Sequence, residues 1–426
     1  MKLRFTLQSW YSVQLKRAIG LLKYLLLALF AWGMSVWVSH LTQAAITPQP
    51  FQEIRGVWMT SNDSDIVRDR PKVQEAVSQL GRLNFNTIYP VVWNSGYAMY
   101  PSLVAQEAGI QPFIHRGLQG QDVLAELTAI AHQHNILVIP WFEFGFMAPP
   151  FSELALNHPN WLTQKRDGTK TWLSAAGEVV WMNPFHPEVQ KLITDLVLEV
   201  VTQYDIDGIQ FDDHLSLPNE FGYDPYTISL YRREMGGSPP ANPENPTWMR
   251  WRANKITAYV KKLNRAIKEK QANAIFSVSP NPYHLAYDTY LQDWVSWIQQ
   301  NLVDELIVQV YRPDIKSFVS EIVRPEIQNV RKKIPTGIGI LTGLRNRPIP
   351  IQNIQAKVQA ARQQGLGMSF FFFESLWEEA PEPIQERKSN FQALFYQPAT
   401  RSPRSAASVP TEGSESSPTS NPASNP

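Results

Sequence analysis

The sequence predicts one parallel (β/α)₈ barrel, flanked by two segments that lie outside it. Between Phe51 and Gln397, eight apolar runs alternate with stretches of helical periodicity. The runs are apolar almost throughout, which is typical of strands buried on both faces of a parallel sheet. No G-x-G-x-x-G or P-loop pattern follows the first run, and this argues against a doubly wound nucleotide-binding sheet.

The predicted elements succeed one another regularly along this body. The predicted strands are 53–60, 86–93, 136–145, 207–213, 275–282, 305–311, 335–341 and 367–375. The predicted helices are 71–83, 121–134, 187–204, 247–270, 313–333 and 351–364, with a less regular one at 287–301 and a closing one at 383–396.

Two of the predicted connections are long, at 146–182 after strand three and 214–246 after strand four. Both leave the carboxyl ends of strands, where barrel active sites are built. Both are rich in aromatic residues, Asn and Pro, so we expect them to form a binding groove. The alternative is compact loops packed by their own aromatic side chains.

The first 45 residues have the order of a secretory signal. Residues 1–23 are basic and contain no acid, residues 24–38 form an uncharged apolar run, and small residues follow at Ala44 and Ala45. The alternative is an uncleaved membrane anchor, but the apolar run is shorter than the ~20 residues that span a bilayer. In either case we expect the remaining chain to be exported and to be periplasmic, envelope-associated or extracellular.

The C-terminal segment 398–426 is made mainly of Ser, Pro, Ala, Thr and Asn, without an aromatic residue. Such a composition buries too little apolar surface to offset the entropy of ordering, so we expect a disordered tail. The sequence therefore predicts one folded domain at 51–397, between a signal or anchor at 1–45 and this tail.

The composition of the chain excludes several classes of protein. The 39 basic and 38 acidic residues give a net charge of +1, which provides no field for holding nucleic acid. The chain has no cysteine, which excludes disulfides, thiolate metal sites and a Cys nucleophile. The 14 Trp, 15 Tyr and 20 Phe serve as bulky core residues or as flat surfaces for sugar rings. No cofactor is predicted.

The end of predicted strand four carries the strongest chemical signal. Its residues are Gln210-Phe211-Asp212-Asp213-His214. Because side chains alternate along a strand, Gln210 and Asp212 should share the inward face while their apolar neighbours face the helices, so that Asp212 points into the barrel mouth with Gln210 behind it. Asp213 lies at the rim, where it can hold Asp212, bind a hydroxyl or cap the next turn. Asp212 is thus the first candidate for a catalytic carboxylate, although a single Asp at a strand end can also be a helix cap.

Two other strand ends offer a second carboxylate. Glu143 shares a face with Trp141 after strand three, and Glu374 shares a face with Phe370 and Phe372 after strand eight. Hydrolysis of a glycosidic bond needs two carboxyl groups, one acid and one nucleophile or base. Glu143 and Glu374 compete for the second role. The aromatic surroundings of Glu374 should raise its pKa by desolvation, which suits a general acid.

Further polar and aromatic residues at strand ends are candidates for substrate binding. They are Asp213, His214, Gln210, Trp141, Trp93, Asn281, Tyr311 and Trp377. Asp212, Asp213 and His214 could also hold zinc, but no H-x-H or H-E-x-x-H pattern accompanies them, so no metal is predicted.

Motifs spread over nearly the whole body resemble the glycosyl hydrolase-like 10 family, which consists of exported bacterial proteins related to barrel glycosidases. The matching motifs are EIRGVWMT (53–60), LGRLNFNTIYPVVW (80–93), VIPWFEFGFMAP (138–149), DGIQFDDH (207–214), SVSPNP (277–282), LIVQVYRPD (306–314) and GLGMSFFFFESLW (365–377). The resemblance implies a (β/α)₈ barrel that hydrolyses glycosidic bonds, with peptidoglycan glycan strands as a candidate substrate.

The chain departs from this pattern at one position, since the family more often has Tyr where His214 stands. Strand four also resembles the D-G-F-R-x-D stretch of α-amylase-like barrels, which places Asp212 at the nucleophile position and Gln210 at the Arg. The missing Arg argues against amylase chemistry.

The leading hypothesis is therefore a glycosidase that cleaves an envelope or extracellular polysaccharide with paired carboxylates. One alternative is a non-catalytic glycan-binding barrel of the cell envelope. Another is a metal-dependent hydrolase or deacetylase on the same scaffold.

Overall fold

A computed structural model describes residues 51–60, 69–111, 122–174, 177–344, 347–377 and 380–401, together with Gly20, Leu22, Lys23, Leu29 and Phe30. The chain divides into the units Met1–Pro50 and Phe51–Pro426, and the fold below is that of the second unit. Most of the predicted signal or anchor, and the tail beyond Arg401, lie outside the described residues. In the described part of the chain, no helix has the length and apolarity needed to cross a membrane.

The second unit is built around a parallel sheet that contains all eight predicted strands. Their bounds are β1 (Arg55–Met59), β2 (Thr87–Pro90), β5 (Leu137–Val138) with β6 (Trp141–Phe142), β10 (Gly208–Asp212), β11 (Ile275–Ser279), β12 (Glu305–Gln309), β13 (Thr336–Leu341) and β16 (Gly367–Phe371).

The sheet closes on itself. Its strand order is β5-β2-β1-β16-β13-β12-β11-β10-β6, and every neighbouring pair is parallel. The strands at the two ends of this order, β5 and β6, are consecutive pieces of predicted strand three. Pro140 lies between them and has no N–H for the ladder, which accounts for the break. The amide of Val92 bonds to the carbonyl of Trp141 at 2.9 Å, which seals the ring.

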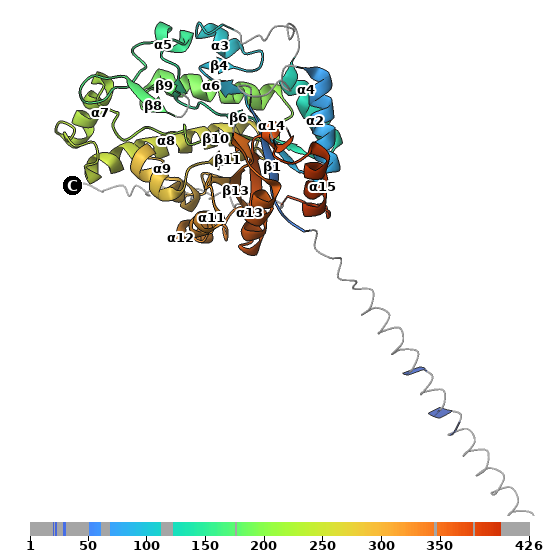
Figure 1. Cartoon of the computed structure of the whole chain (residues 1–426). Coiled ribbons are helices and arrows are strands. Elements are labelled where there is room, and N and C mark those ends of the chain that lie inside the picture. Colours follow the sequence, from blue (N-terminus) through green and yellow to red (C-terminus); the bar gives the residue numbers. More distant parts are fainter. Residues whose placement is uncertain are drawn as a thin grey trace, which may run out of the picture. The chain divides into compact units, whose positions relative to one another are not determined.

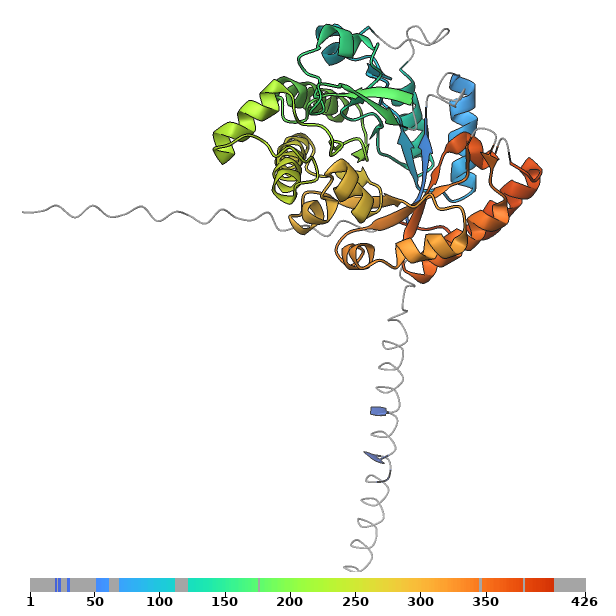
Figure 2. The ribbon, with the colours of Figure 1, turned by 60° about the vertical axis from the view of Figure 1, so that its left-hand side comes forward.

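Helices surround this barrel, as Figure 2 shows. The covering helices are α2 (Arg70–Arg82), α4 (Val123–Gln133), α6 (Pro187–Gln203), α8 (Pro246–Lys270), α10 (Trp294–Gln299), α11 (Ile315–Ile322), α12 (Pro325–Val330), α13 (Ile351–Gln363) and α15 (Ile384–Leu394). The predicted helix 313–333 is split into α11 and α12 because Pro325 starts a new helix at its first position. In place of the single helix predicted at 287–301, the structure has two helices, α9 (Tyr283–Tyr290) and α10, which are separated by Leu291 with φ 54°.

The connections at the carboxyl ends of the strands carry small elements of their own. They are β3 (Trp93–Asn94), β4 (Tyr97–Ala98), α3 (Leu103–Glu107), β7 (Met147–Ala148), α5 (Glu153–Asn157), β8 (Thr171–Ser174), β9 (Gly177–Trp181), α7 (Pro225–Met235), β14 (Gly343–Leu344), β15 (Arg347–Pro348) and α14 (Phe373–Trp377). The predicted loop 146–182 thus contains a three-stranded antiparallel sheet in the order β7-β9-β8. Several of the small elements, α3, α5, β4, β8 and β9, lie in the upper part of Figure 1.

The long connection after β10 is held by one buried cation. Arg252 of α8 is fully buried and donates hydrogen bonds to the carbonyl oxygens of Phe221 at 2.6 Å and Pro243 at 2.5 Å, and also to that of Asn219. Because a buried guanidinium needs several acceptors, this residue fixes the course of the connection from inside.

Side chains alternate between two cores as the sequence predicted for strand four. Ile209 and Phe211 belong to the large core between sheet and helices, while the interior of the barrel holds a smaller cluster that includes Trp58, Tyr89 and Trp141. Gln210 lies in this interior and accepts a hydrogen bond from Trp58 Nε1 at 2.6 Å. The prediction that Gln210 and Asp212 face the barrel interior is therefore confirmed.

For strand eight, the predicted face shared by Phe370, Phe372 and Glu374 does not extend to Glu374. Phe370 faces outward, with its ring 5.4 Å from that of Phe391 in α15, whereas Phe371 faces inward, 6.1 Å from Trp58. Strand β16 ends at Phe371, and Glu374 lies in the first turn of α14. The two-residue alternation stops where the strand stops, so it does not give the direction of Glu374.

The folded body extends past the predicted boundary at Gln397. The amide of Glu53 bonds to the carbonyl of Thr400 at 3.1 Å, and Arg401 forms an ion pair with the buried Glu305 of β12. Arg401 also donates to Thr87 Oγ1 at 2.9 Å. This segment therefore closes the amino-terminal end of the barrel, opposite the ends that carry Asp212.

Candidate active site

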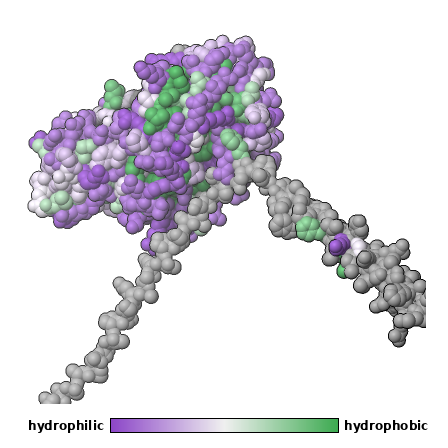
Figure 3. Space-filling model, turned by 90° about the horizontal axis from the view of Figure 1, so that it is seen from below, coloured by the Kyte–Doolittle hydropathy of each residue, from purple (hydrophilic) through white to green (hydrophobic). Residues whose placement is uncertain are grey.

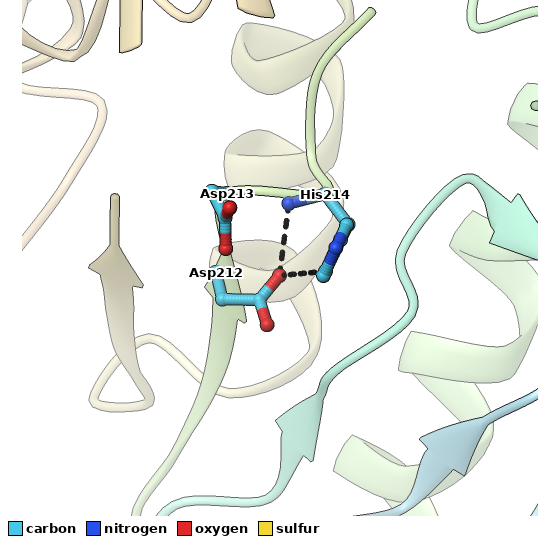
Figure 4. Close-up of side chains that lie close together, drawn as sticks. All are labelled: Asp212, Asp213 and His214. Carbon is cyan, nitrogen blue, oxygen red and sulfur yellow. Dashed lines mark hydrogen bonds and ion pairs between the residues drawn. The ribbon is translucent and has the colours of Figure 1, made fainter. Parts of the chain in front are cut away.

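Strand β10 delivers Asp212 to the carboxyl end of the barrel, where its side chain is only 3% exposed. The chain turns sharply after it, and Asp213 and His214 follow in the turn (Figure 4). Asp212 Oδ1 accepts two hydrogen bonds from His214, one from the backbone amide and one from ring Nδ1, both at 2.9 Å. Its other oxygen, Oδ2, accepts none from the described residues and is turned away from the ring (Figure 4). Asp212 is thus a fixed carboxylate with one oxygen left for a substrate.

His214 links Asp212 to the end of strand three. Its Nδ1 lies 2.6 Å from the backbone carbonyl oxygen of Glu143 as well as 2.9 Å from Asp212 Oδ1. Both neighbours are acceptors, so Nδ1 carries a hydrogen. Burial lowers the pKa of His214, but the charges of Asp212 and Asp213 and these hydrogen bonds outweigh it and raise the pKa to about 10. His214 is therefore an imidazolium at neutral pH.

The close approach of His214 to strand three depends on a glycine. Gly145 has φ 44°, and a Cβ at this position would lie 2.5 Å from the carbonyl oxygen of His214. The neighbouring amide of Phe146 donates to that same oxygen at 3.1 Å. Any side chain at residue 145 would push the two segments apart.

Asp212 itself has a perturbed pKa. Burial disfavours its charged form and raises the pKa to about 6, although the positive His214 acts in the opposite direction. The carboxylate and the imidazolium therefore coexist as an ion pair between about pH 6 and about pH 10. A carboxylate in a barrel mouth whose pKa is raised toward neutral pH is typical of catalytic groups.

Asp213 is held by amides from the next two strands. Asn281 Nδ2 donates to its Oδ2 at 2.8 Å, and Gln309 Nε2 donates to its Oδ1 at 3.2 Å. Gln309 also donates to the carbonyl of Ser279 at 2.7 Å. Among the described residues these two amides are the side chains that bond to this carboxylate. The side chain of Asp213 therefore does not cap the next turn, which was one of the roles considered for it from the sequence.

A third carboxylate belongs to the same cluster. Glu143 follows β6 and accepts a hydrogen bond from Asn94 Nδ2, which belongs to the β3–β4 hairpin. Burial raises the pKa of Tyr311 well above 10, and the charges of Asp213, Asp212 and Glu143 raise it further. The Tyr311 hydroxyl therefore stays protonated at neutral pH, within the electrostatic influence of all three acids.

Aromatic rings form the floor beneath these groups. The ring of Phe371 lies 5.6 Å from that of Tyr311, 6.1 Å from Trp58 and 6.3 Å from Trp141. Two buried polar atoms of this region, Trp141 Nε1 and Ser279 Oγ, make no hydrogen bond with the described chain. Unsatisfied buried groups are costly, so these atoms are suited to bind a ligand or water.

The structure separates the predicted substrate-binding residues. Asp213, His214 and Asn281 come together at Asp212, and Trp141 and Tyr311 lie in the aromatic floor against Phe371. Three others do not face the mouth, and they are Gln210, Trp93 and Trp377.

Each of these three packs for a structural reason. Gln210 is fully buried between Trp58 and Ser277, to which it donates at 2.9 Å. Trp93 is fully buried and donates to the carbonyl of Gly145 at 3.1 Å. Trp377 lies in α14 with its ring 5.4 Å from Phe391 of α15, so it packs outward against the helix layer.

Two residues of the site, Gln309 and Gln292, were not predicted from the sequence. Gln309 is detectable in principle, because it lies two residues before Tyr311 on the same strand face. Gln292, which donates to the carbonyl of Asp212 at 2.8 Å, follows a helix and gives no signal in the sequence.

One group of acidic and imidazole residues in the described chain has the spacing of a metal site, with ligand atoms of Asp212, Asp213 and His214 within 4.8 Å of one another. Their hydrogen bonds do not fit such a site. The Nδ1 atom of His214 carries a hydrogen between two acceptors, and both oxygens of Asp213 accept from amides. These atoms are arranged as an ion pair and a hydrogen-bonded network.

A closed parallel barrel with clustered carboxylates and an aromatic floor at the carboxyl ends of its strands defines a barrel glycoside hydrolase. The match of the glycosyl hydrolase-like 10 family to residues 53–360 shows that the chain belongs to that family. It is 27% identical over 315 residues to the glycosyl hydrolase DigH of Escherichia coli (strain K12), covering 64% of this chain and 69% of that protein.

Solved structures agree on the fold. The glycoside hydrolase domain of PgaB from Bordetella bronchiseptica superposes with a TM-score of 0.58 at 14% identity, covering 81% of this chain and 98% of that one. The catalytic domain of β-amylase from Paenibacillus polymyxa gives a TM-score of 0.55 at 9% identity, covering 82% and 99%. The chain is therefore a glycosyl hydrolase with a TIM-barrel-like fold, and its substrate is a carbohydrate.

Proposed function

We propose that this enzyme is exported and cleaves a polysaccharide of the cell envelope or the extracellular space, with peptidoglycan glycan strands as the first candidate. The basic, apolar and small-residue order of residues 1–45 supports export. Similarity to a glycosyl hydrolase of Escherichia coli supports glycosidic hydrolysis.

The observation that carries the catalytic assignment is the hydrogen bonding of Asp212. Both of its bonds from His214 reach Oδ1, so Oδ2 is oriented and available. Asp212 acts as the nucleophile toward the anomeric carbon, or as the base that activates water. His214 keeps this carboxylate ionised at neutral pH and fixes its direction.

Glu143 is the proposed general acid. Its backbone carbonyl accepts a hydrogen bond from the same imidazole that binds Asp212. The charge of its carboxylate, like those of Asp212 and Asp213, raises the pKa of Tyr311. Glu374, the competing candidate from the sequence, lies in α14. A matched pair of variants decides between them, since Glu143→Gln and Glu374→Gln remove one acid each at equal size.

The test of the function is incubation of the full chain with peptidoglycan, peptide-free glycan strands and common bacterial and plant polysaccharides, with products followed by mass spectrometry. The wild type should release oligosaccharides, and Asp212→Asn should lower the rate by at least about 100-fold, the usual contribution of such a group. Glu143→Gln should behave like Asp212→Asn, and Glu374→Gln should not.

Two other outcomes of this experiment would favour a different function. Binding of a glycan by the wild type without any cleavage would favour a non-catalytic glycan-binding barrel. Loss of activity with a chelator, restored by a divalent metal, would favour the metal-dependent hydrolase or deacetylase. The hydrogen bonds of Asp213 and His214 lead us to expect that a chelator leaves the rate unchanged.

A further inference from the structure

Four rings in succession lead from the acid cluster toward solvent. The ring centroids of His214 and Trp181 are 5.8 Å apart, those of Trp181 and Trp172 are 6.0 Å apart, and those of Trp172 and Tyr290 are 5.6 Å apart. Trp181 is fully buried, whereas Trp172 and Tyr290 are partly exposed. We call Trp172 and Tyr290 the aromatic wall.

Both members of the wall sit on elements that are tied to the catalytic strand end. Trp172 lies on β8, which pairs with β9, and β9 ends in Trp181, whose Nε1 donates to the carbonyl of Ser216 at 2.8 Å. Tyr290 ends α9, and its carbonyl accepts from the amide of Leu217 at 3.0 Å. The wall is therefore fixed relative to Asp212 before any ligand arrives, which lowers the entropy cost of binding.

The hydroxyl group of Tyr290 lies within the electrostatic influence of Asp213 and Asp212. Burial raises its pKa to about 12, and the charges of Asp213 and Asp212 contribute to the rise. The hydroxyl therefore remains protonated at neutral pH. Within the described chain it makes no hydrogen bond, so it is available to donate to a sugar hydroxyl.

The packing of the hairpin does not by itself account for the exposed faces of these rings. Trp181 already anchors β9 through its buried ring and its N–H. A second Trp on the neighbouring strand that keeps one part in solvent, beside a Tyr with a free hydroxyl, has the properties of an amphipathic binding surface. The apolar C–H face of a pyranose ring fits a flat indole, and its hydroxyls fit the tyrosine.

Figure 3 shows a face of the barrel unit that is mostly hydrophilic, with separate apolar areas. Strongly exposed apolar residues such as Phe151 and Leu173, at 83% and 80%, have no link of this kind to the acid cluster among the described contacts.

We propose that the aromatic wall binds a pyranose ring of the glycan beyond the sugar held at Asp212, and so makes the enzyme selective for oligomeric over monomeric glycosides. This proposal rests on the proposed function, because the ligand is taken to be the polysaccharide substrate. Neither residue of the wall is assigned a part in the chemical step.

The test measures glycan binding separately from cleavage. Trp172→Ala and Tyr290→Ala are made in the full chain that also carries Asp212→Asn, with Leu173→Ala as the matched control, because Leu173 is the next residue of the same strand and faces away. Binding of β-1,4-linked N-acetylglucosamine oligomers and of peptide-free glycan strands is measured by isothermal titration calorimetry. Thermal unfolding of every variant verifies the fold.

Each alanine variant should weaken oligomer binding about three- to tenfold, the range of a single aromatic contact, while Leu173→Ala binds like its parent. Trp172→Phe, which keeps a flat ring, should recover most of the affinity. In the chain with Asp212 restored, the loss should fall on KM more than on kcat.

The outcomes separate this proposal from the function on which it rests. If Trp172→Ala and Tyr290→Ala bind and cleave like Leu173→Ala, the wall is packing only and the proposal is overturned, while hydrolysis stands. If the wild type binds glycans without cleaving them, the proposed hydrolytic function is wrong. The affinities of the variants still show whether the aromatic wall binds glycan. If the parent chain binds none of these glycans, the proposal for the wall is overturned, and hydrolysis is decided separately by the cleavage assay of the wild type.

Discussion

At the scale of single residues, the site is organised by the pair Asp212 and His214. The imidazole bonds to one oxygen of the carboxylate and to the backbone of Glu143, so it positions two strand ends at once. The resemblance to the family leads us to expect Tyr at this position, and a phenol would not supply the positive charge. His214 therefore changes the electrostatics of the site as well as its shape.

The pH dependence of activity follows from Asp212. Its pKa of about 6 means that it becomes protonated below that pH, and a protonated carboxyl cannot act as nucleophile or base. We expect kcat/KM to fall as the pH drops through about 6, measured on the glycan that the enzyme cleaves. Full activity at pH 4 would show that Asp212 is not used in its ionised form.

Replacement of His214 should shift the pH at which kcat/KM falls on the acid side, which we call the acid limb. His214 lowers the pKa of Asp212, so His214→Asn removes that contribution and the pKa should rise above about 6. The limb of the kcat/KM profile should shift to higher pH in the variant. A limb that stays in place would exclude the imidazolium as the group that tunes Asp212.

The same residue links stability to pH. The folded-state pKa of His214 is about 10, above its ordinary 6.5, so the folded state binds the proton more tightly than the unfolded state. This contribution to the free energy of unfolding is fully present below pH 6.5 and is lost as the pH rises through about 10. Urea unfolding of the wild type and of His214→Asn across this range should show a decline that the variant lacks.

At the scale of elements, alternation along strands predicted part of the site and failed where strands end. It placed Gln210 and Asp212 correctly because β10 is regular through Asp212. It failed for Glu374 because β16 stops at Phe371. Trp93 and Trp377 were assigned to the mouth as aromatics near strand ends, but an aromatic side chain satisfies a buried core equally well.

The contact between the connections after strands three and four gives a prediction at this scale. Gly145→Ala puts a Cβ 2.5 Å from the backbone oxygen of His214 and strains a residue with positive φ. We expect a loss of about 1–3 kcal/mol in the free energy of unfolding, together with reduced activity because His214 is displaced.

A second glycine provides the control for this variant. Gly168 also has positive φ, at 90°, but a Cβ there would meet nothing within 4 Å. Gly168→Ala should therefore lose some stability from backbone strain and keep its activity. Equal activity losses in the two variants would show that the close approach at His214 is not the cause.

At the scale of the whole molecule, the segment that ends in Arg401 closes the amino-terminal end of the barrel. A ladder of buried polar groups begins at Arg401 and Glu305. It continues through Ser277, which donates to Glu305 at 2.8 Å, and through Gln210, which donates to Ser277 at 2.9 Å. Its last member, Trp58 Nε1, donates to Gln210 at 2.6 Å just beneath the layer of Asp212.

Removal of Arg401 should destabilise the whole barrel. Glu305 is 1% exposed, and without its cationic partner it becomes a buried, uncompensated charge. We expect Arg401→Ala, or a chain shortened to Pro398, to lose about 3–5 kcal/mol in the free energy of unfolding. A chain ended at Ser402 keeps Arg401 and should retain wild-type stability by urea denaturation.

Replacing both partners checks the mechanism. Arg401→Met combined with Glu305→Gln leaves no buried charge, so the double variant should be more stable than Arg401→Ala alone. If the double variant were as unstable as the single one, the role of Arg401 would be packing rather than charge compensation.

The sequence by itself determined the eight βα units, their order and the strand end that carries Asp212, because apolar periodicity and the alternation of side chains are local properties of the chain. Only the tertiary structure decided which groups surround that carboxylate. Asn281 and Gln309 reach Asp213 across 68 and 96 residues, and Arg401 reaches Glu305 across 96. Closure of the barrel brings such distant residues together, and no local pattern records the contacts between them.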